Sequence, residues 1–383
     1  MIEFRLPSLG ADMEQGKLLE WKVAPGQKVA KGDVVAVVDT SKAAVEVEIW
    51  EAGTVHELIA RPGETYPVGA VIARLLAPGE APGAAAPAAA TPPLAVAARR
   101  RVSPAARTRA GELGLSIDAV AGSGPEGAIT LQDVEAAAAG KAPAPAPAAA
   151  EDKQAAMQRA ETKRADMQRV VAAAMSRSKR EIPHYYLSEA IALRKAGEWL
   201  ERENAARPVT GRLLMAALFL KAVARACVRH PEMNGFFRDG SFVPSAPVHV
   251  GVAIALRQGG LVAPAILDAQ AKSLGVLMRD LSDLVRRARA GSLRSSEVSS
   301  PTITVTNLGD EGVEAVHGVI YPPQVALVGF GKAGERPWVE EGRLCALRAV
   351  TATLAADHRV SNGHRGALFL AEINRLLQAP EAL

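Results

Sequence analysis

The chain has 383 residues, of which 49% are hydrophobic, and its net charge is +4, so it is long enough for two or three domains of about 100–200 residues each. Its two cysteines, Cys227 and Cys345, argue against a disulfide framework and against a zinc site and favour a reducing, cytoplasmic location. No apolar run reaches the roughly 18 residues of a membrane span, and the first residues lack the apolar stretch of a secretory signal, so we expect neither.

Residues 1–76 form the first predicted domain, and they contain an internal repeat. Residues 16–38 align with residues 53–75 without gaps at an offset of 37. Pro-Gly pairs ending at Gly26 and Gly63 occupy equivalent places and separate strand-like stretches. The pattern predicts two similar small sheets related by a pseudo-two-fold axis.

A short segment between the two repeats carries a candidate attachment site. Val45 and Val47 alternate with Glu46 and Glu48, so we expect the valines to face inward and the glutamates outward. The preceding turn then forms a hairpin tip with Lys42 at its most exposed point. An exposed lysine is ordinarily only a solvated charge, so the residues around Lys42 decide its interpretation.

The repeat and the triplet Thr40-Ser41-Lys42 resemble lipoyl domains, whose modified lysine lies in a TDKA-type hairpin between two quasi-symmetric sheets. The resemblance implies an all-β flattened barrel with lipoate attached covalently to Lys42. Biotin domains share this fold but place a methionine on each side of the lysine. Ser41 and Ala43 stand there instead, which makes a biotin carrier the second choice.

Two stretches rich in Ala and Pro, residues 77–98 and residues 140–159, are predicted linkers. Ala and Pro without larger apolar side chains cannot build a core, and repeated Pro favours an extended, semi-rigid chain. The second stretch ends in charged residues from Glu151 onward. The linkers either simply join the domains or act as spacers for a domain that must travel.

Residues 99–139 form a small predicted domain of two helices. Ser103 and Pro104 suit the N-cap and first position of one helix, and Thr130, with Asp133 three residues on, suits the N-cap of another. A domain of forty residues is near the lower limit for a cofactor-free fold. Such a domain has no room for an active site, which favours a binding function.

The pattern SPxxRxxAxExG at residues 103–114 resembles the peripheral-subunit-binding domain of 2-oxo acid dehydrogenase complexes. The resemblance implies docking to a thiamine-diphosphate-dependent decarboxylase and to dihydrolipoamide dehydrogenase. No aromatic residues interleave the basic residues, which disfavours nucleic acid. Candidate contacts to partner carboxylates, which are alternatively plain solubilising charges, are Arg99, Arg100, Arg101, Arg107 and Arg109.

Residues 160–383 alternate predicted helices with predicted strands, which indicates an α/β sandwich. Amphipathic or apolar helical patterns cover residues 213–229 and 274–290. Strand patterns cover residues 248–256, 262–267, 302–308, 325–329 and 347–355.

The most informative segment is Asp357-His358-Arg359-Val360-Ser361-Asn362-Gly363, which follows an alternating apolar run and precedes a helical pattern over residues 366–377. His358 is therefore expected where a buried strand ends, beside a cleft. A neutral imidazole there can take a proton from a thiol near pH 7, which contributes about 10²–10⁴ in rate. By spacing alone, a single histidine beside Asp and Arg is more often a surface or ion-paired residue.

The segment resembles the DHRxxDG motif of the 2-oxo acid dehydrogenase complex acyltransferases, a family similar in fold to chloramphenicol acetyltransferase. The resemblance implies acyl transfer from dihydrolipoamide on Lys42 to coenzyme A, with His358 as general base. Thr306 takes the place of the family's oxyanion-stabilising serine, and Asn362 takes the place of the final Asp, where it can orient but cannot act as a base. In the family, histidine and hydroxyl meet across the interface of a homotrimer, the building block of a larger core.

A second hypothesis is a non-catalytic, lipoyl-bearing scaffold that only docks the partner enzymes. The presence of His358 within an otherwise intact motif favours the enzyme. The sequence does not fix the acyl group: acetyl is the first choice, and a branched-chain or acetoin-derived group is the next. No metal is expected to take part.

Overall fold

The computed structural model groups the chain into two compact units, one of Met1–Pro82 with Glu161–Leu383 and one of Gly83–Ala160. Lys42, Arg99, Arg100 and Arg101 lie outside the described residues, as do nearly all of the two linkers, so their roles stay predictions. No helix in the described part of the chain is long and apolar enough to cross a membrane. The structure describes residues 1–9, 13–40, 44–77, 103–112, 120, 123, 128–138, 165, 168–256, 260–309 and 312–383.

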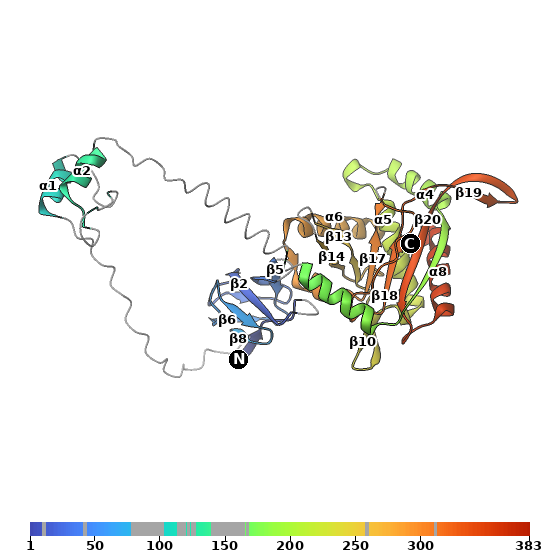
Figure 1. Cartoon of the computed structure of the whole chain (residues 1–383), viewed down its shortest axis with the longest axis horizontal. Coiled ribbons are helices and arrows are strands. Elements are labelled where there is room, and N and C mark those ends of the chain that lie inside the picture. Colours follow the sequence, from blue (N-terminus) through green and yellow to red (C-terminus); the bar gives the residue numbers. More distant parts are fainter. Residues whose placement is uncertain are drawn as a thin grey trace. The chain divides into compact units, whose positions relative to one another are not determined.

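The N-terminal domain consists of two antiparallel sheets that enclose one apolar core, as the repeat predicted (Figure 1). One sheet has the strand order β1 (Ile2–Arg5), β8 (Val71–Leu76), β6 (Gly53–Leu58), β3 (Lys28–Val29). The other has the order β5 (Ala44–Glu48), β4 (Val34–Asp39), β2 (Gln15–Trp21), β7 (Thr65–Pro67).

The backbone repeats the internal symmetry of the sequence. Gly26 and Gly63 both adopt left-handed angles, with φ of +87° and +93°. The equivalent pair Gly32 and Gly69 has φ of +91° and +86°. A Cβ atom at any of the four would meet nothing within 4 Å, so glycine is required there by the turn and not by crowding. The matching turns confirm the pseudo-symmetric pair of sheets.

The second unit holds helices α1 (Pro104–Glu112) and α2 (Leu131–Ala138). The Ser103 hydroxyl accepts a hydrogen bond from the amide of Ala106 at 3.2 Å, which confirms the predicted N-cap. The Asp133 carboxylate accepts from the Thr130 amide at 2.8 Å. Hydrogen bonds, first those from Ser123, hold the pKa of Asp133 far below its usual range. A small core joins the helices through Ala106, Ala110, Val120, Ile129 and Val134.

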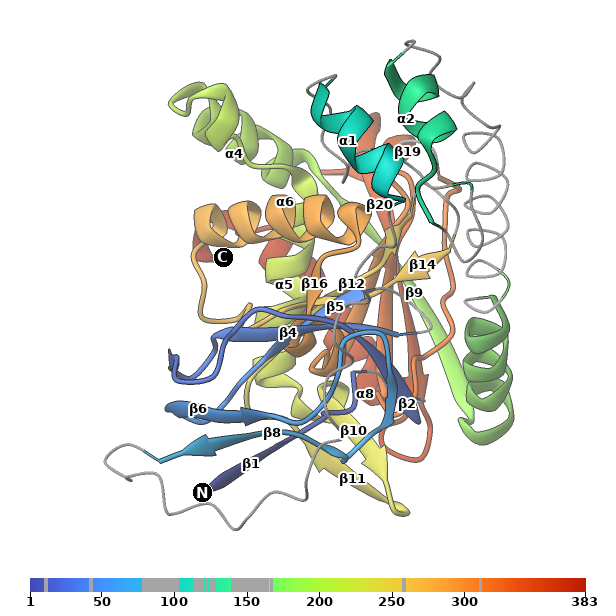
Figure 2. The same ribbon diagram turned by 90° about the vertical axis from the view of Figure 1, so that its left-hand side faces the viewer.

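A mixed sheet of seven strands forms the centre of the C-terminal domain (Figure 2). β17 and β18 run parallel, β20 is antiparallel to β18, and β9 pairs with the far edge of β20. The strand order is β15 (Ala265–Ile266), β12 (Val250–Val252), β17 (Ile303–Asn307), β18 (Ala326–Phe330), β20 (Arg343–Asp357), β19 (Gly334–Glu340), with β9 (His184–Ala192) also on β20.

The two faces of this sheet have different partners because side chains alternate along each strand. Val350, Ala352, Leu354 and Ala356 of β20 belong to the main core with the helices. Ala355, on the opposite face, packs against Ile182 and Ile320. The helices in the main core are α4 (Arg194–Ala205), α5 (Met215–Arg229), α6 (Leu274–Ala290) and α8 (Gly363–Leu377).

The α/β architecture predicted for this domain is confirmed, and the α6 bounds match the predicted residues 274–290. Residues 168–181 are helical and precede β9. The predicted stretches 248–256 and 262–267 are each divided into two short strands, β12 and β13 (Ile254–Ala255), and β14 (Leu261–Val262) and β15. Further short elements are β10 (Gly235–Arg238), β11 (Ser241–Pro244), β16 (Leu293–Arg294) and α7 (Ser295–Ser299).

Candidate active site

His358 lies in the turn directly after β20, at the end of a buried strand as predicted. Its backbone N–H donates to the carbonyl of Pro183 at 2.9 Å. Its ring packs edge-on against Tyr185, with 5.2 Å between the ring centroids. The side chain is exposed, and no described residue of the same chain hydrogen-bonds its ring nitrogens. The imidazole is therefore positioned by backbone and packing, on an exposed side chain whose ring nitrogens are not hydrogen-bonded to any described residue of the chain.

An ion pair within the turn fixes the direction in which His358 leaves the strand. Asp357 is fully buried, and its carboxylate accepts from Nε and Nη2 of Arg359 at 3.0 and 2.7 Å. The Arg359 guanidinium also lies over the ring of Phe237, 3.8 Å from its centroid. A buried carboxylate is tolerated only when it is paired in this way. Asp357 and Arg359 thus form a scaffold for the turn.

Two more contacts hold the other side of the turn. The Tyr185 hydroxyl shares a hydrogen bond of 2.8 Å with the Ser361 hydroxyl, and burial raises the pKa of Tyr185. The Asn362 side-chain oxygen accepts from the amide of Arg365 at 3.1 Å and caps α8. Because Asn is a strong N-cap, α8 begins at Gly363, three residues before the predicted start. Within a single chain, this cap is the hydrogen bond that the structure shows for the Asn362 side chain.

Thr306 is half-buried near the C-terminal end of β17. Ile303 and Val305 face the main core, so Thr304 and Thr306 face the opposite side of the sheet. The Thr304 hydroxyl donates to the Gln324 side chain at 2.7 Å. The Thr306 hydroxyl has no hydrogen-bond partner among the described residues of the chain. It is therefore available as a donor to a bound group.

The sheet places Thr306 and His358 at opposite ends within one chain. Thr306 pairs with Gly329, which pairs with Thr353 on β20. His358 follows Thr353 by five residues, and β20 runs away from Thr306. At about 3.3 Å per residue and 4.8 Å per strand, the two side chains are about 19 Å apart. One chain alone therefore does not bring the predicted base and the predicted hydroxyl together.

His184 starts β9, and its contacts show a structural role. Its Nδ1 lies 2.8 Å from the carbonyl of Ile182, and its Nε2 accepts from the amide of Ile320 at 3.1 Å. This pattern requires a proton on Nδ1 only, so the ring is neutral. Burial lowers the pKa of His184. The adjacent Tyr185, which supports His358, was not predicted, because nothing in the sequence signals a contact between residues so far apart.

The attachment hairpin is framed by described residues although Lys42 itself is outside them. β4 and β5 pair in antiparallel register as far as Asp39 and Ala44. Residues 40–43 therefore join two strand ends that lie side by side, which fits a modified lysine carried on a short connection. No group of three or more potential ligand side chains that could hold a metal ion occurs in the described ranges.

Comparisons with known families match three parts of the chain. The model for "2-oxoacid dehydrogenases acyltransferase (catalytic domain)" matches residues 157–383, the "Biotin-requiring enzyme" model, which covers biotin and lipoyl domains, matches residues 2–75, and the "e3 binding domain" model matches residues 100–135. The predicted domain bounds at 76, 99, 139 and 160 remain predictions.

A similar curated protein is the dihydrolipoyllysine-residue acetyltransferase component of the Staphylococcus aureus pyruvate dehydrogenase complex, 31% identical over 100% of this chain and 98% of that protein.

Two solved structures are similar to the C-terminal domain. One is the Azotobacter vinelandii dihydrolipoamide acetyltransferase, with TM-score 0.53 and 27% identity over 56% of this chain and 89% of that one. The study of that structure concerns the role of a serine, a histidine and an asparagine in the catalytic mechanism. The serine lies 52 residues before the histidine, and the asparagine lies four residues after it. The other is the cubic core of the pyruvate dehydrogenase multienzyme complex, with TM-score 0.54 and 27% identity over 56% and 90% of the two chains. The chain therefore belongs to the family of 2-oxoacid dehydrogenase acyltransferases.

Proposed function

We propose that this chain transfers an acyl group, acetyl as first choice, from dihydrolipoamide on Lys42 to coenzyme A, and that it scaffolds a 2-oxo acid dehydrogenase complex. The observation that carries the proposal is the placement of His358, an exposed side chain that is held by a backbone hydrogen bond, ring packing and an adjacent ion pair. The acetyltransferase relative supports acetyl over a branched-chain or acetoin-derived group. A cytoplasmic location stays a prediction.

The residues proposed for catalysis match the Azotobacter protein in spacing. Thr306 precedes His358 by 52 residues, and Asn362 follows it by four, as the serine and asparagine do there. This agreement supports Thr306 as the hydroxyl donor, although threonine adds a methyl group. It also supports an orienting role for Asn362, which the cap on α8 already holds in place.

If Thr306 and His358 act at one site, their separation implies a second copy of the chain. A reacting carbon must lie within about 3–3.5 Å of the attacking atom and within hydrogen-bond reach of its donor. Two groups about 19 Å apart in one chain cannot meet this condition. We infer that Thr306 of one subunit and His358 of another build each site. The similarity to a cubic core supports a trimer that assembles further.

The proposed chemistry moves one proton and one acyl group. When bound, the lipoyl group supplies the acyl carbon as a thioester. His358 removes the proton from the coenzyme A thiol, which at an ordinary pKa near 8.5 is mostly protonated at pH 7. The thiolate attacks the acyl carbon, and the Thr306 hydroxyl donates to the carbonyl oxygen as negative charge develops, an interaction worth about 3 kcal/mol. His358 then returns the proton to the departing sulfur.

The subunit-binding domain is proposed to dock dihydrolipoamide dehydrogenase, with the thiamine-diphosphate-dependent decarboxylase as a further partner. The match to the E3-binding family supports the first partner, because E3 denotes the dihydrolipoamide dehydrogenase component. Arg107 is exposed, whereas Arg109 forms ion pairs with Glu112 at 2.7 Å and Glu135 at 4.0 Å. Arg107 is therefore the better placed of the two for a partner carboxylate. Replacing Arg107 with Glu is expected to weaken binding of the dehydrogenase in titration calorimetry.

The test of the catalytic proposal is acetyl-coenzyme A formation from free acetyl-dihydrolipoamide by the full chain. His358→Ala is expected to lower kcat by about 10²–10⁴. His364→Ala is the matched control, because this histidine is exposed in the first turn of α8, and it should leave the rate unchanged. Activity of His358→Ala within tenfold of the parent would overturn the proposal. Intact-mass spectrometry distinguishes lipoate from biotin on Lys42.

A further inference from the structure

The N-terminal domain contacts the C-terminal domain by strand addition. β16 pairs in parallel with β5, with Leu293 opposite Val45 and Arg294 opposite Glu46. The sheet that contains β4 and β5 thereby gains a fifth strand, which comes from the C-terminal domain. β5 is otherwise an edge strand, and an edge offers unpaired backbone groups to any strand that fits it.

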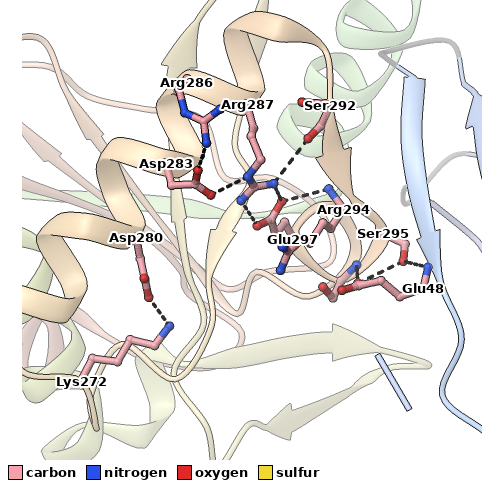
Figure 3. A network of polar contacts seen from close by, with 11 residues as sticks. Glu48, Lys272, Asp280, Asp283, Arg286, Arg287, Ser292, Arg294, Ser295 and Glu297 are labelled. Carbon is pink, nitrogen blue, oxygen red and sulfur yellow. Dashed lines mark hydrogen bonds and ion pairs between the residues drawn. The ribbon is translucent and has the colours of Figure 1, made fainter. Parts of the chain in front are cut away.

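Glu48 at the end of β5 was expected to face outward into solvent, and the structure corrects this expectation. The side chain does point away from the domain's own core, but α7 covers it and leaves it 7% exposed (Figure 3). Its carboxylate accepts from the Ser296 amide at 3.2 Å and from the Ser295 hydroxyl at 3.4 Å. The Ser295 hydroxyl in turn accepts from the Glu48 amide at 3.1 Å. Both partners of this contact are buried, so it is a specific one.

The C-terminal side of the contact is braced from behind. Glu297 of α7 is buried, accepts from Nη1 of Arg287 on α6 at 2.6 Å, and also accepts from the Arg294 amide at 2.9 Å. Arg287 is bound in addition by Asp283 at 2.6 Å, and these hydrogen bonds, above all that to Glu297, raise its pKa (Figure 3). This network fixes β16 and α7 onto α6, so the surface is formed in advance of the contact. Preformed surfaces bind at a lower entropic cost.

A cavity of about 530 Å³ lies beside the contact, at the His358 end of the large sheet. Its walls include Thr40 and Val45, which flank the attachment hairpin, and Phe236 and Arg238 of β10. Phe237, between these two, faces the other way and carries the Arg359 guanidinium. The contact thus brings the strand ends that frame the hairpin to the end of the sheet where His358 lies.

We propose that β16 and α7 form a docking site for the chain's own lipoyl domain, with Glu48 as its polar anchor. The inference rests on the proposed function, because docking matters only if this domain carries the acyl group to His358. Val298 of α7 adds an apolar contact, since it packs against the cores of both domains. The site holds the lipoyl domain next to the catalytic sheet while the domain is not bound to a partner enzyme.

Cysteine trapping in the full chain tests the docking without any need for activity. Glu46→Cys with Arg294→Cys, in a Cys345→Ser background, places thiols on adjacent strands, about 5 Å apart, within disulfide range. The control pair is Glu57→Cys with Arg294→Cys, because Glu57 is exposed on the other sheet. We expect the first pair to cross-link within the chain at least tenfold faster. Equal rates for the two pairs would overturn the proposal.

A charge reversal at the anchor gives a second readout. Glu48→Lys, which faces away from the lipoyl core, is expected to slow cross-linking of the first pair about tenfold to hundredfold. It should also slow transfer from the attached arm and leave transfer from free acetyl-dihydrolipoamide unchanged, whereas Glu57→Lys should change neither. Slow cross-linking with unaltered arm transfer would overturn the proposal. Inactivity with free substrate would reject the proposed function instead, because trapping does not depend on it.

Discussion

Two inactive variants should restore each other's activity if each active site is shared between two subunits. His358→Ala removes the base and is expected to lower kcat by about 10²–10⁴. Thr306→Val keeps the shape of the side chain, removes the hydroxyl, and is expected to lower kcat by about 10²–10³. Each variant alone should therefore retain about 1% of the parent activity or less.

The expected recovery follows from the separation of about 19 Å between the two side chains in one chain. Chains that carry Thr306→Val retain His358, and chains that carry His358→Ala retain Thr306. If the two variants are co-expressed in equal amounts and mix at random in cyclic trimers, about one site in four receives both intact residues. Acetyl-coenzyme A formation should then reach about a quarter of the parent rate.

The assay compares co-expressed variants with the same variants purified separately and mixed afterward, since assembled trimers should exchange subunits slowly. The control is the double variant, Thr306→Val with His358→Ala, co-expressed with the parent chain. It shows how far activity falls when intact residues are diluted by chains that lack both. If the co-expressed single variants stay near 1% while both assemble normally, the shared site is wrong. His358 and Thr306 would then not act on the same substrate.

Three further outcomes test the packing around the site. Arg359→Met should lower the unfolding free energy of the C-terminal domain by about 3 kcal/mol in urea titration, because it leaves the buried Asp357 carboxylate unpaired. Adding Asp357→Asn to this variant should recover part of the loss, and additive losses would contradict the pairing. Burial lowers the folded-state pKa of His184 below 6.5, so the unfolded chain binds the proton preferentially and stability is lost as the pH falls below about 6.5. The unfolding free energy should therefore change less between pH 7 and pH 5 in His184→Gln than in the parent, and an equal change would refute this assignment. Gly329→Ala should cost about 1–3 kcal/mol, since its Cβ would lie 2.3 Å from a backbone carbonyl oxygen, whereas Gly334→Ala, with nothing within 4 Å, should be nearly neutral in thermal unfolding.

The local elements were predictable where one strong local signal dominates. α6 was assigned to residues 274–290 because its apolar positions recur at helical spacing, and Gly291, with φ of +75°, ends it as a C-cap. β20 was assigned only over residues 347–355, because its first half, from Arg343 onward, pairs outside the core with β19 and lacks an alternation of apolar and polar residues.

The composition of the site was predictable from spacing and resemblance, but its geometry was not. Nothing in the sequence shows that β20 runs antiparallel to β18, which is what separates His358 from Thr306. The burial of Glu48 also lacks a local signal, since its cover comes from Ser295 and Ser296, about 250 residues away. Contacts between distant segments depend on topology, which one sequence leaves open.

The strand addition at β5 has a consequence for the states in which the lipoyl domain is elsewhere. Once β16 is absent, β5 is an open edge of its sheet, and every copy of the chain has the same edge. Such edges invite self-association between identical carriers. Glu46 and Glu48 lie on that edge, and their like charges disfavour an in-register parallel pairing of two copies. The residue that anchors the domain at rest thus also keeps travelling domains apart.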